Sequence, residues 1–541
     1  MLFHSQIFIL GFLPVCLSGF FLAGRLAGRA AALGWLIAAS LFFYGWWNPP
    51  FTLLLVGSIG GNFALGCLIR GLAEAPGPSC DKGGHHPLDG GHPADRHRAR
   101  RGGQPAPANP SQPDPRQPRL TRFHLGHFHF GHFHLARICL GGAIAANLAL
   151  LAWFKYADFL RGIIAPDSPT LSIFLPLAIS FFTFQQIIYL TDCLRHPQEN
   201  PGLVPYAAFV AFFPHLIAGP LVSPRDIMPQ LRAPGLATPN ADNLQAGLTL
   251  FLLGLAKKLV LADMFGGFAD TGFNAAANGE TLSFFEAWYA TLAYALQIYF
   301  DFSGYSDMAI GLARMLNIRF PLNFDSPYQA RDIADFWRRW HITLGLFLRD
   351  YIYIPLGGSR HGRSRHLGAL AATMLLGGLW HGAAWQFVLW GGLHGLFLAI
   401  HAVYRGPALP RRLSHGLTLL AVILAWVPFR AADLPTTWSM ARGLVGLHGI
   451  ALPQMIVDAF PTLSALADPV PVLRFLGDAR TLSFPEVSVC LLLGWTIVLT
   501  LPHIHRWQDR TRALGLTAGF ALTVQALFFA PHVSPFLYFQ F

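Results

Sequence analysis

Residues 367–404 read LGALAATMLLGGLWHGAAWQFVLWGGLHGLFLAIHAVY, a run of 38 residues without Asp, Glu, Lys or Arg. A continuous helix of this length would extend about 55 Å, whereas the hydrocarbon core of a bilayer is roughly 30 Å thick. The run must therefore break, tilt strongly or re-enter the membrane. Gly377, Gly378 and Gly382 are the predicted break points, because glycine tolerates unusual dihedrals and close backbone approach.

The same apolar character extends over most of the chain. Of its 541 residues, 53% are hydrophobic and only 12% are charged, against roughly 25% charged residues in ordinary soluble domains. We therefore predict an all-α polytopic membrane protein, organised as a single domain over residues 1–541. About a dozen spans are expected, near residues 7–22, 30–47, 51–69, 138–154, 171–190, 203–219, 245–265, 283–300, 367–403, 414–430, 485–502 and 513–530.

Basic residues between the first spans predict the orientation of the chain. Arg25 and Arg29 follow the first span, and Arg70 follows the third. Short loops rich in Lys and Arg face the cytoplasm, so the amino terminus is expected outside. The first span lacks the basic flank and cleavage site of a signal peptide and is expected to be retained. The net charge of +11 indicates topology and contact with lipid headgroups rather than nucleic-acid binding.

Residues 74–136 interrupt the apolar pattern with Pro, Gly, His and Arg. This composition predicts a disordered cytoplasmic loop. The end of the loop, FHLGHFHFGHFHL, brings five histidines close together in sequence: His124, His127, His129, His132 and His134. A metal-binding tract is one interpretation, but low complexity is the favoured one, and no metal site is predicted.

A second exception, residues 320–356, is too charged to cross a bilayer yet rich in aromatic residues. Asp335 is three or four residues from Arg338, Arg339 and Arg331, which allows ion pairs within a helix. The segment is therefore predicted to be a re-entrant or interfacial amphipathic helix. Its apolar stripe would consist of Ile333, Phe336, Trp337, Trp340, Leu344, Phe347 and Leu348.

Two histidines in similar aromatic settings are the candidates for chemistry. His341 follows Trp340 in the amphipathic segment, and His381 follows Trp380 at the glycine-rich break. Imidazole is the side chain whose ordinary pKa lies nearest neutrality, so a pair at membrane depth suggests proton transfer. The alternative is structural: a buried histidine bonded to a carbonyl, or a solvated one beside arginines.

Acidic residues form a polar knot in YFDFSGYSDMAIG, expected at the end of the span near 283–300. Asp301 and Asp307 lie in this knot, and acids inside a membrane are usually paired or functional. Either could orient a histidine or pair with Arg338 or Arg339. Structural pairing is the favoured interpretation.

Long stretches of this chain resemble the membrane-bound O-acyltransferase family, in the bacterial branch that includes the alginate O-acetylation protein. The longest are DFSGYSDMAIGLARMLNIRFPLNFDSPYQARDIADFWRRWHITLGLFLRDYIYIPLGGSR (301–360) and GGLWHGAAWQFVLWGGLHG (377–395). Shorter ones are LFFYGWWNPPFTLLLVGSI, SFFTFQQIIYLTDCLR, FPHLIAGPLVSP and the closing PFLYFQF. The resemblance omits the loop near 74–136 and the stretch near 405–485.

The resemblance implies a ring of helices around a central funnel, with interfacial helices near the centre. His341 and His381 match the two family histidines and would be catalytic. The supporting or substrate-binding candidates are Asp301, Asp307, Asn323, Arg338, Arg339, Trp340 and Trp380. No bound cofactor is expected.

The resemblance also implies the reaction and its setting. Acyl-CoA, in particular acetyl-CoA, or an acyl carrier protein would donate an acyl group in the cytoplasm. The acceptor would be a hydroxyl of an extracytoplasmic polysaccharide such as alginate, or peptidoglycan, with an SGNH-type partner completing the transfer. The location would be the bacterial inner membrane, among its lipids.

A transporter or proton-coupled flippase is the alternative from another class of protein, because intramembrane His and Asp residues also mark ion paths. We see no internal repeat of hydropathy. The charged amphipathic segment is also more typical of the wall of an active site than of a transporter whose helix bundles move against each other. The sequence does not choose the acceptor, the donor or the histidine that acts as base.

Overall fold

A computed structural model describes residues 1–74, 130–407, 409–465, 468–470 and 484–506, with 517, 519–521, 524 and 536–537. Helices make up almost all of the regular structure in this part of the chain. The first half contains η1 (Ile7–Phe12), α1 (Leu13–Gly45), α2 (Pro49–Glu74), α3 (Phe130–Ile164), α4 (Ile179–Arg195), α5 (Leu203–Ala211), α6 (Phe213–Leu216), α7 (Pro224–Arg232), α8 (Ala241–Ala256), η2 (Lys257–Ala262) and α9 (Asp263–Ala277).

The second half begins with the long α10 and ends with α18 and a short turn. Its elements are α10 (Phe284–Met315), η3 (Pro327–Gln329), α11 (Ile333–Arg339), α12 (Ile342–Leu348), η4 (Arg349–Tyr353), α13 (Arg363–His381), α14 (Trp385–Val403), α15 (Arg411–Arg430), α16 (Leu434–Leu444), β1 (Ala451–Pro453), α17 (Gln454–Ala459), η5 (Pro461–Ala465), β2 (Asp468–Val470), α18 (Phe484–Thr500) and η6 (Ile504–Arg506). The two strands pair in parallel.

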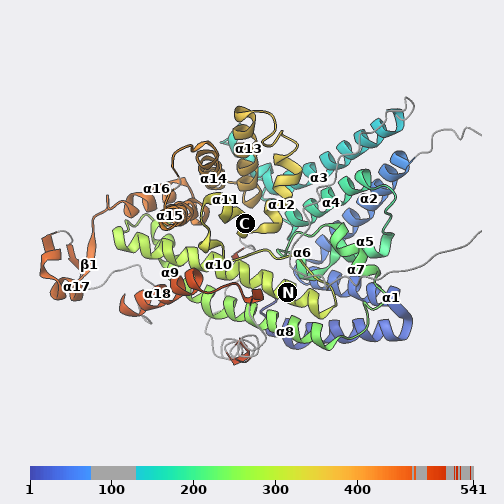
Figure 1. Ribbon diagram of the computed structural model, residues 1–541, viewed down its shortest axis with the longest axis horizontal. Helices are drawn as coiled ribbons and strands as arrows, with labels where there is room; N and C mark the ends of the chain where they lie inside the picture. Colours follow the sequence, from blue (N-terminus) through green and yellow to red (C-terminus); the bar gives the residue numbers. More distant parts are fainter. Residues whose placement is uncertain are drawn as a thin grey trace, which may run out of the picture.

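Helix α10 runs through the middle of the molecule (Figure 1). Helices α1 to α5 lie on one side of it, and α14 to α17 lie on the other. Five described helices are long and apolar enough to cross a membrane: Ile7–Gly45, Pro49–Glu74, His132–Ile164, Trp385–Val403 and Arg411–Arg430. The protein is thus an all-α membrane protein, while a ring of about a dozen spans around a funnel stays a prediction.

The first of these helices contains both of the first two predicted spans. Gly28 has φ 79° inside α1, a left-handed conformation that glycine adopts at little cost. The two halves pack against each other, since the Trp35 indole donates to the Cys16 carbonyl at 3.0 Å. The break lies between Arg25 and Arg29, as the basic loop predicted.

The break in the 367–404 run is confirmed at one of its three predicted positions. Helix α13 ends at His381, and Gly382 has extended dihedrals before α14 begins. Gly378 stays helical and allows close packing instead. A Cβ atom there would lie 2.2 Å from the Phe387 carbonyl oxygen of α14.

Three other predicted boundaries were wrong. The span expected near 203–219 is two short helices, because Pro214 lacks the N–H that a continuous helix needs. The span expected from 171 begins only at Ile179, after an irregular segment. The polar knot lies in the interior of α10, not at the end of a span, since that helix continues to Met315.

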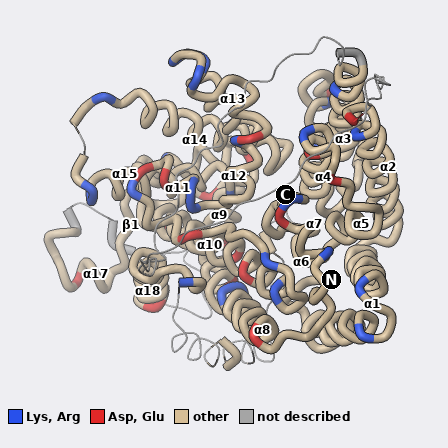
Figure 2. The backbone as a smooth tube through the Cα atoms, turned by 45° about the vertical axis from the view of Figure 1, so that its right-hand side comes forward, with Lys and Arg blue, Asp and Glu red and all other residues tan. Residues whose placement is uncertain are grey.

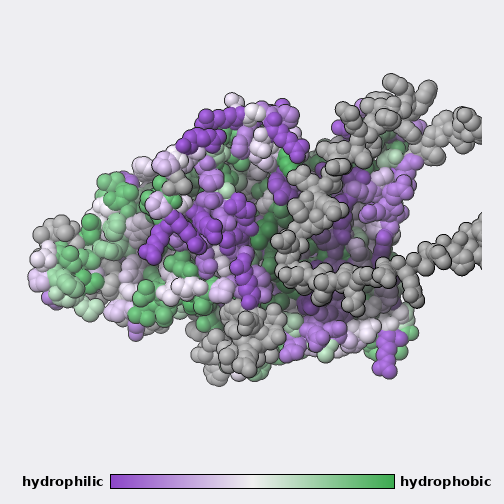
Figure 3. Space-filling view, in the orientation of Figure 1, coloured by the Kyte–Doolittle hydropathy of each residue, from purple (hydrophilic) through white to green (hydrophobic). Residues whose placement is uncertain are grey.

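The surface separates apolar from hydrophilic regions. Hydrophilic residues gather over α11 and around the start of α13, whereas the end of the molecule near β1 and α17 is more apolar (Figure 3). Most of the predicted loop 74–136 lies outside the described residues. Its last residues belong to α3, which begins at Phe130.

Glycine pairs bring the central helices α8 and α10 into close contact. A Cβ atom at Gly254 would lie 2.5 Å from the Gly304 carbonyl, and one at Gly247 would lie 2.6 Å from the Gly311 carbonyl. Small residues spaced in this way let membrane helices approach at backbone distance. The contact places the end of α8 against the polar knot of α10, where charged residues of both signs meet (Figure 2).

Candidate active site

The two Trp-His pairs meet in one aromatic cluster, although they are forty residues apart in sequence. The ring of Trp380 lies 4.9 Å from the ring of His381 and 6.2 Å from the ring of His341. Both imidazoles are buried. The fold therefore brings the two candidate catalytic histidines next to the same indole.

His341 lies at a chain reversal rather than within the predicted amphipathic helix. Its backbone is left-handed, with φ 43° and ψ 52°, which costs a non-glycine residue about 1–3 kcal/mol. The predicted helix is consequently divided into α11 and α12. Asn323 holds the reversal, because its backbone carbonyl accepts the N–H of Ile342 at 2.9 Å.

The side chain of Asn323 determines which nitrogen of His341 carries the proton. Its Oδ1 lies 3.3 Å from the Thr343 backbone nitrogen, 2.9 Å from Thr343 Oγ1 and 3.1 Å from His341 Nδ1. A backbone N–H can only donate, so this atom must be the amide oxygen. His341 then donates from Nδ1, and its Nε2 carries the lone pair that a base or acceptor needs.

Aromatic rings pack around His381. Trp390 lies 5.1 Å away and Phe429 5.0 Å away between ring centroids, both edge to face. His381 also lines a cavity of about 250 Å³ together with Trp47, Lys155 and the segment 174–181. This imidazole therefore combines a low-polarity environment with a cavity large enough for part of a ligand.

Two side chains of α3 bind the end of α13 directly before the break. The Tyr156 hydroxyl donates to the Leu379 carbonyl at 2.6 Å. The Lys155 ammonium donates to the carbonyls of Trp380 at 2.5 Å and His381 at 3.2 Å. The last carbonyls of a helix lack partners within the helix and attract cations, so these contacts hold His381 at a defined helix end.

The polar knot is paired with two lysines that the sequence analysis missed. Lys257 Nζ lies 2.6 Å from Asp307, and Lys258 Nζ lies 2.8 Å from both Asp301 and Asp263. We call these five residues the charge core. Pairing with Arg338 or Arg339 is thus wrong, while structural pairing of the two aspartates is confirmed. Adjacent lysines inside an apolar span were the overlooked signal.

Asp301 also approaches the histidine cluster from the charge core. A small cavity of about 20 Å³ is lined by Asp301, Trp340 and His381, among others. Asp301 further accepts the backbone N–H of Leu537 at 3.0 Å. The residues near the chain end therefore reach the centre of the protein, beside the candidate site.

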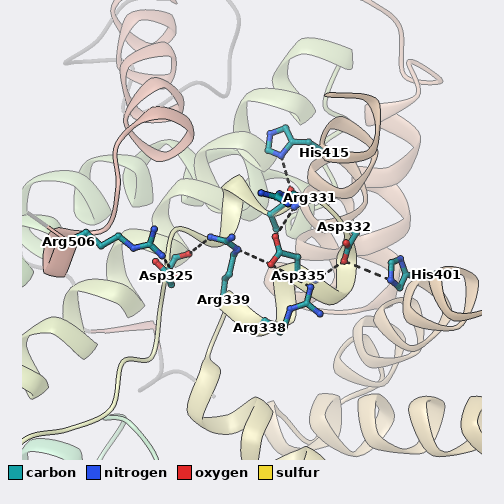
Figure 4. A network of polar contacts seen from close by, with 10 residues as sticks. Asp325, Arg331, Asp332, Asp335, Arg338, Arg339, His401, His415 and Arg506 are labelled. Carbon is teal, nitrogen blue, oxygen red and sulfur yellow. Dashed lines mark hydrogen bonds and ion pairs between the residues drawn. The ribbon is translucent and has the colours of Figure 1, made fainter. Parts of the chain in front are cut away.

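Arg338 and Arg339 belong to a surface network on α11 (Figure 4). Asp335 lies 3.1 Å from Arg339 and 3.6 Å from Arg338, which confirms two of the three predicted ion pairs. Arg331 instead donates its backbone N–H to Asp335 at 3.0 Å. Partial burial works to raise the pKa of Asp335, but hydrogen bonds from the Arg331 backbone and from Arg339 hold it below its ordinary value of 3.8. Asp325 pairs with Arg506 in the same network.

The predicted site residues thus fall into three places. The histidine cluster contains His341, His381, Asn323, Trp340 and Trp380. The charge core contains Asp301 and Asp307, and the surface network contains the two arginines. No group of three or more potential ligands among the described residues is arranged to hold a metal ion. Catalytic roles for any of these residues stay predictions.

Comparison with known proteins identifies the class of this fold and site. The model of the membrane-bound O-acyltransferase family matches residues 173–408, which include both histidines. The chain is 35% identical to a peptidoglycan O-acetyltransferase of Helicobacter pylori, over 100% of this chain and 98% of that protein. The chain belongs to the membrane-bound O-acyltransferase family, and it is an O-acyltransferase.

Two further relatives are named for acceptors other than peptidoglycan. A probable alginate O-acetylase of Pseudomonas aeruginosa is 36% identical over 82% of this chain and 75% of its own length. A teichoic acid D-alanyltransferase of Bacillus subtilis is 27% identical over 48% of this chain and 67% of its own length. The chain therefore lies within the bacterial branch to which the sequence motifs pointed.

Proposed function

We propose that this enzyme moves an acetyl group from a cytoplasmic thioester toward a hydroxyl of an extracytoplasmic polysaccharide, with alginate or a related exopolysaccharide as acceptor. Acetyl-CoA is the proposed donor and an acyl carrier protein the alternative. An SGNH-type protein would complete the transfer outside, and the enzyme would reside in the bacterial inner membrane. Relatives named alginate O-acetylases support this acceptor.

Peptidoglycan is a second candidate acceptor. The Helicobacter pylori relative, which is named for that polymer, matches this chain along its full length. Both acceptors present sugar hydroxyls outside the cytoplasmic membrane. The same transfer chemistry serves either one.

The observation that carries the proposal is the position of the cavity beside His381. Trp47 and residues 174–178 line it, and both belong to connections that follow outward-running helices in the predicted orientation. An acceptor group from the outer side would therefore meet His381. This favours His381 as the residue that takes the proton of the attacking hydroxyl.

The proposed reaction is the direct transfer of the acyl group from the thioester to the hydroxyl beside the two histidines. The hydroxyl oxygen bonds to the acyl carbon, the carbon–sulfur bond breaks, and the proton passes through the histidine to the leaving thiolate. A positioned general base contributes about a hundred to ten thousand-fold to such a step. His341, held in one tautomer by Asn323, would present Nε2 as a fixed acceptor beside the reacting groups.

Acetate released from purified glycans tests the proposal. In a strain that lacks this protein, mild base should release less ester-linked acetate from exopolysaccharide, and the wild-type protein should restore it. H381A and H341A should not restore it, whereas H401A, which changes an exposed histidine on α14, should. Loss of acetate from peptidoglycan alone would select the second acceptor. Normal acetylation with H381A at normal expression would refute the mechanism.

The transporter alternative needs a separate measurement. Purified protein in liposomes should consume the thioester of radiolabelled acetyl-CoA and release free CoA when an acceptor is supplied. A transporter would move its substrate without cleaving that thioester. Absence of cleavage by an otherwise folded protein would therefore contradict the proposed reaction.

A further inference from the structure

A second cavity lies at the other end of α4, away from the histidine cluster. It has a volume of about 500 Å³ and lies between α2, α4 and α7. Its lining includes three arginines and one histidine, together with two carboxylates: Arg70, Arg225, Arg232, His196, Asp192 and Glu199. Cationic groups therefore outnumber anionic ones around it.

Arg70 is the unusual member of this lining. Only 6% of its surface is exposed, yet no carboxylate of a described residue pairs with it. One guanidinium nitrogen donates to the Tyr189 hydroxyl at 3.3 Å, and the guanidinium lies 5.2 Å from that ring. Its Nε has no hydrogen-bond partner among the residues that the structure describes. A guanidinium remains charged in proteins, so its burial without an anion is costly.

The surroundings place this cavity at the cytoplasmic side in the predicted orientation. Arg70 lies in the last turns of α2, which ends at Glu74. The guanidinium of Arg29, beside the cytoplasmic turn at Gly28, donates to the backbone carbonyl of Arg232 in α7. Arg225 and Arg232 are both exposed at the rim. Any ligand of the cavity therefore enters from the side that holds phosphorylated metabolites and lipid headgroups.

We propose that this cavity binds a phosphate group, with Arg70 as its buried anchor and Arg225 and Arg232 at the entrance. The planar guanidinium matches phosphate oxygens with two parallel hydrogen bonds and is the preferred partner for them. The phosphate belongs either to the cytoplasmic donor or to an anionic lipid. The existence of the site does not depend on the proposed reaction, whereas its assignment to the donor does.

Helix α4 connects this site with the candidate active site. Ser180 at one end of α4 lines the cavity of His381, and Asp192 near the other end lines the phosphate cavity. Twelve residues of helix correspond to about 18 Å. A donor anchored by its phosphate would need a long extended arm to bring its thioester to the histidines, which is the form of a pantetheine thioester.

Binding measurements with R70Q test the site. Purified protein in nanodiscs of neutral phosphatidylcholine is titrated with coenzyme A, with inorganic phosphate and with pantetheine, which lacks phosphate. R70Q should weaken binding of coenzyme A about tenfold or more, and R70K should recover part of it. R412Q, which removes an exposed arginine at the start of α15, should bind like the wild type.

A second experiment, with an anionic lipid, distinguishes the source of the phosphate. Nanodiscs that contain phosphatidylglycerol are analysed by native mass spectrometry for retained lipid. Selective loss of that lipid in R70Q, with coenzyme A binding unchanged, would assign the site to a lipid headgroup. Equal retention of both probes by R70Q and R412Q would overturn the proposal. If R70Q does not fold, the R225Q/R232Q pair at the exposed rim gives the same comparison.

Failure of this proposal can be told apart from failure of the proposed reaction. H381A should abolish acetyl transfer and leave phosphate binding intact. R70Q should raise the KM for a phosphorylated donor and leave kcat at saturating donor unchanged. A defect of R70Q in kcat alone would contradict the phosphate site.

Discussion

The histidine cluster and the charge core bury polar groups in the middle of the same protein by opposite means. In the charge core, Lys258 contacts two aspartates at 2.8 Å, so opposite charges offset one another. In the histidine cluster, His341 and His381 are surrounded by aromatic rings, and a single amide orients one of them. Paired charges offset one another inside the protein, whereas the imidazoles are buried as neutral groups among rings, where the proposed reaction would use them for proton transfer.

The strongest test of this contrast is the loss of either histidine. H341A and H381A should each lower acetyl transfer by about a hundred to ten thousand-fold, because in the proposed reaction each histidine would contact the reacting atoms. Their thermal unfolding should change little. Rates measured with radiolabelled acetyl-CoA, beside H401A as control, check this. Retention of wild-type activity by either variant would assign that histidine to packing.

Breaking the charge core should mainly affect stability. D301N leaves the buried Lys258 with one carboxylate in place of two, and removing one partner of a buried pair costs about 3–5 kcal/mol. Thermal unfolding in detergent measures this loss. The matched variant D270N, at an ion pair with partly exposed side chains, should cost less than about 1 kcal/mol. A normal melting temperature with lost activity would instead place Asp301 in catalysis.

Loss of the Asn323 side chain should lower activity by changing the orientation of His341. N323A removes the side-chain acceptor for His341 Nδ1 and for Thr343, so the tautomer of His341 loses its support. The backbone carbonyl of residue 323, which accepts the N–H of Ile342, stays in place. We expect kcat to fall about a hundredfold, as for a misplaced catalytic group. The kcat of T343V should fall less, because this variant keeps the contact between Asn323 and His341. Equal rates for N323A and wild type would show that the orientation of His341 is unimportant.

Lys155 should have a smaller effect through His381. K155M preserves most of the volume but removes the ammonium that caps the end of α13. We expect kcat to fall about tenfold, in line with the loss of charge-assisted hydrogen bonds, with an unchanged KM for the donor. Y156F, which loses one neighbouring carbonyl contact, is the matched control. An altered KM alone would indicate a role in donor binding.

The surface network should matter least. R338Q removes an exposed side chain that lies 3.6 Å from Asp335, and exposed ion pairs contribute about 0–1 kcal/mol. Activity and melting temperature should stay close to the wild type. A large loss of activity would show that Arg338 binds substrate, as the family resemblance suggested.

Much of the fold could be predicted where a local rule was sufficient. The break at Gly382 followed from the length of an uncharged run, and the turn at Gly28 followed from basic residues between two spans. Predicted helix boundaries were wrong where contacts between residues distant in sequence decide where a helix ends. The amphipathic helix is interrupted because Asn323 binds the backbone after His341, and an apolar stripe contains no information about that contact.

The sequence supplied the two histidines and, through the family resemblance, their neighbours Asn323, Trp340 and Trp380, but it did not supply the lysines. Lys155, Lys257 and Lys258 act on residues more than forty positions away along the chain. Each is a lone or paired lysine in an apolar segment. The sequence shows these lysines, but it does not show which residues they contact. Only the packing of α3 on α13 and of α8 on α10 shows what these cations neutralise.

The amino-acid sequence by itself determined the membrane environment, the main breaks and the family, because hydropathy, glycine positions and long motifs are local properties. The tertiary structure alone decided the tautomer of His341, the capping of α13 and the pairing of the charge core. Those outcomes depend on hydrogen bonds and ion pairs, whose strength falls steeply with distance and angle. Such contacts exist only once distant helices have packed.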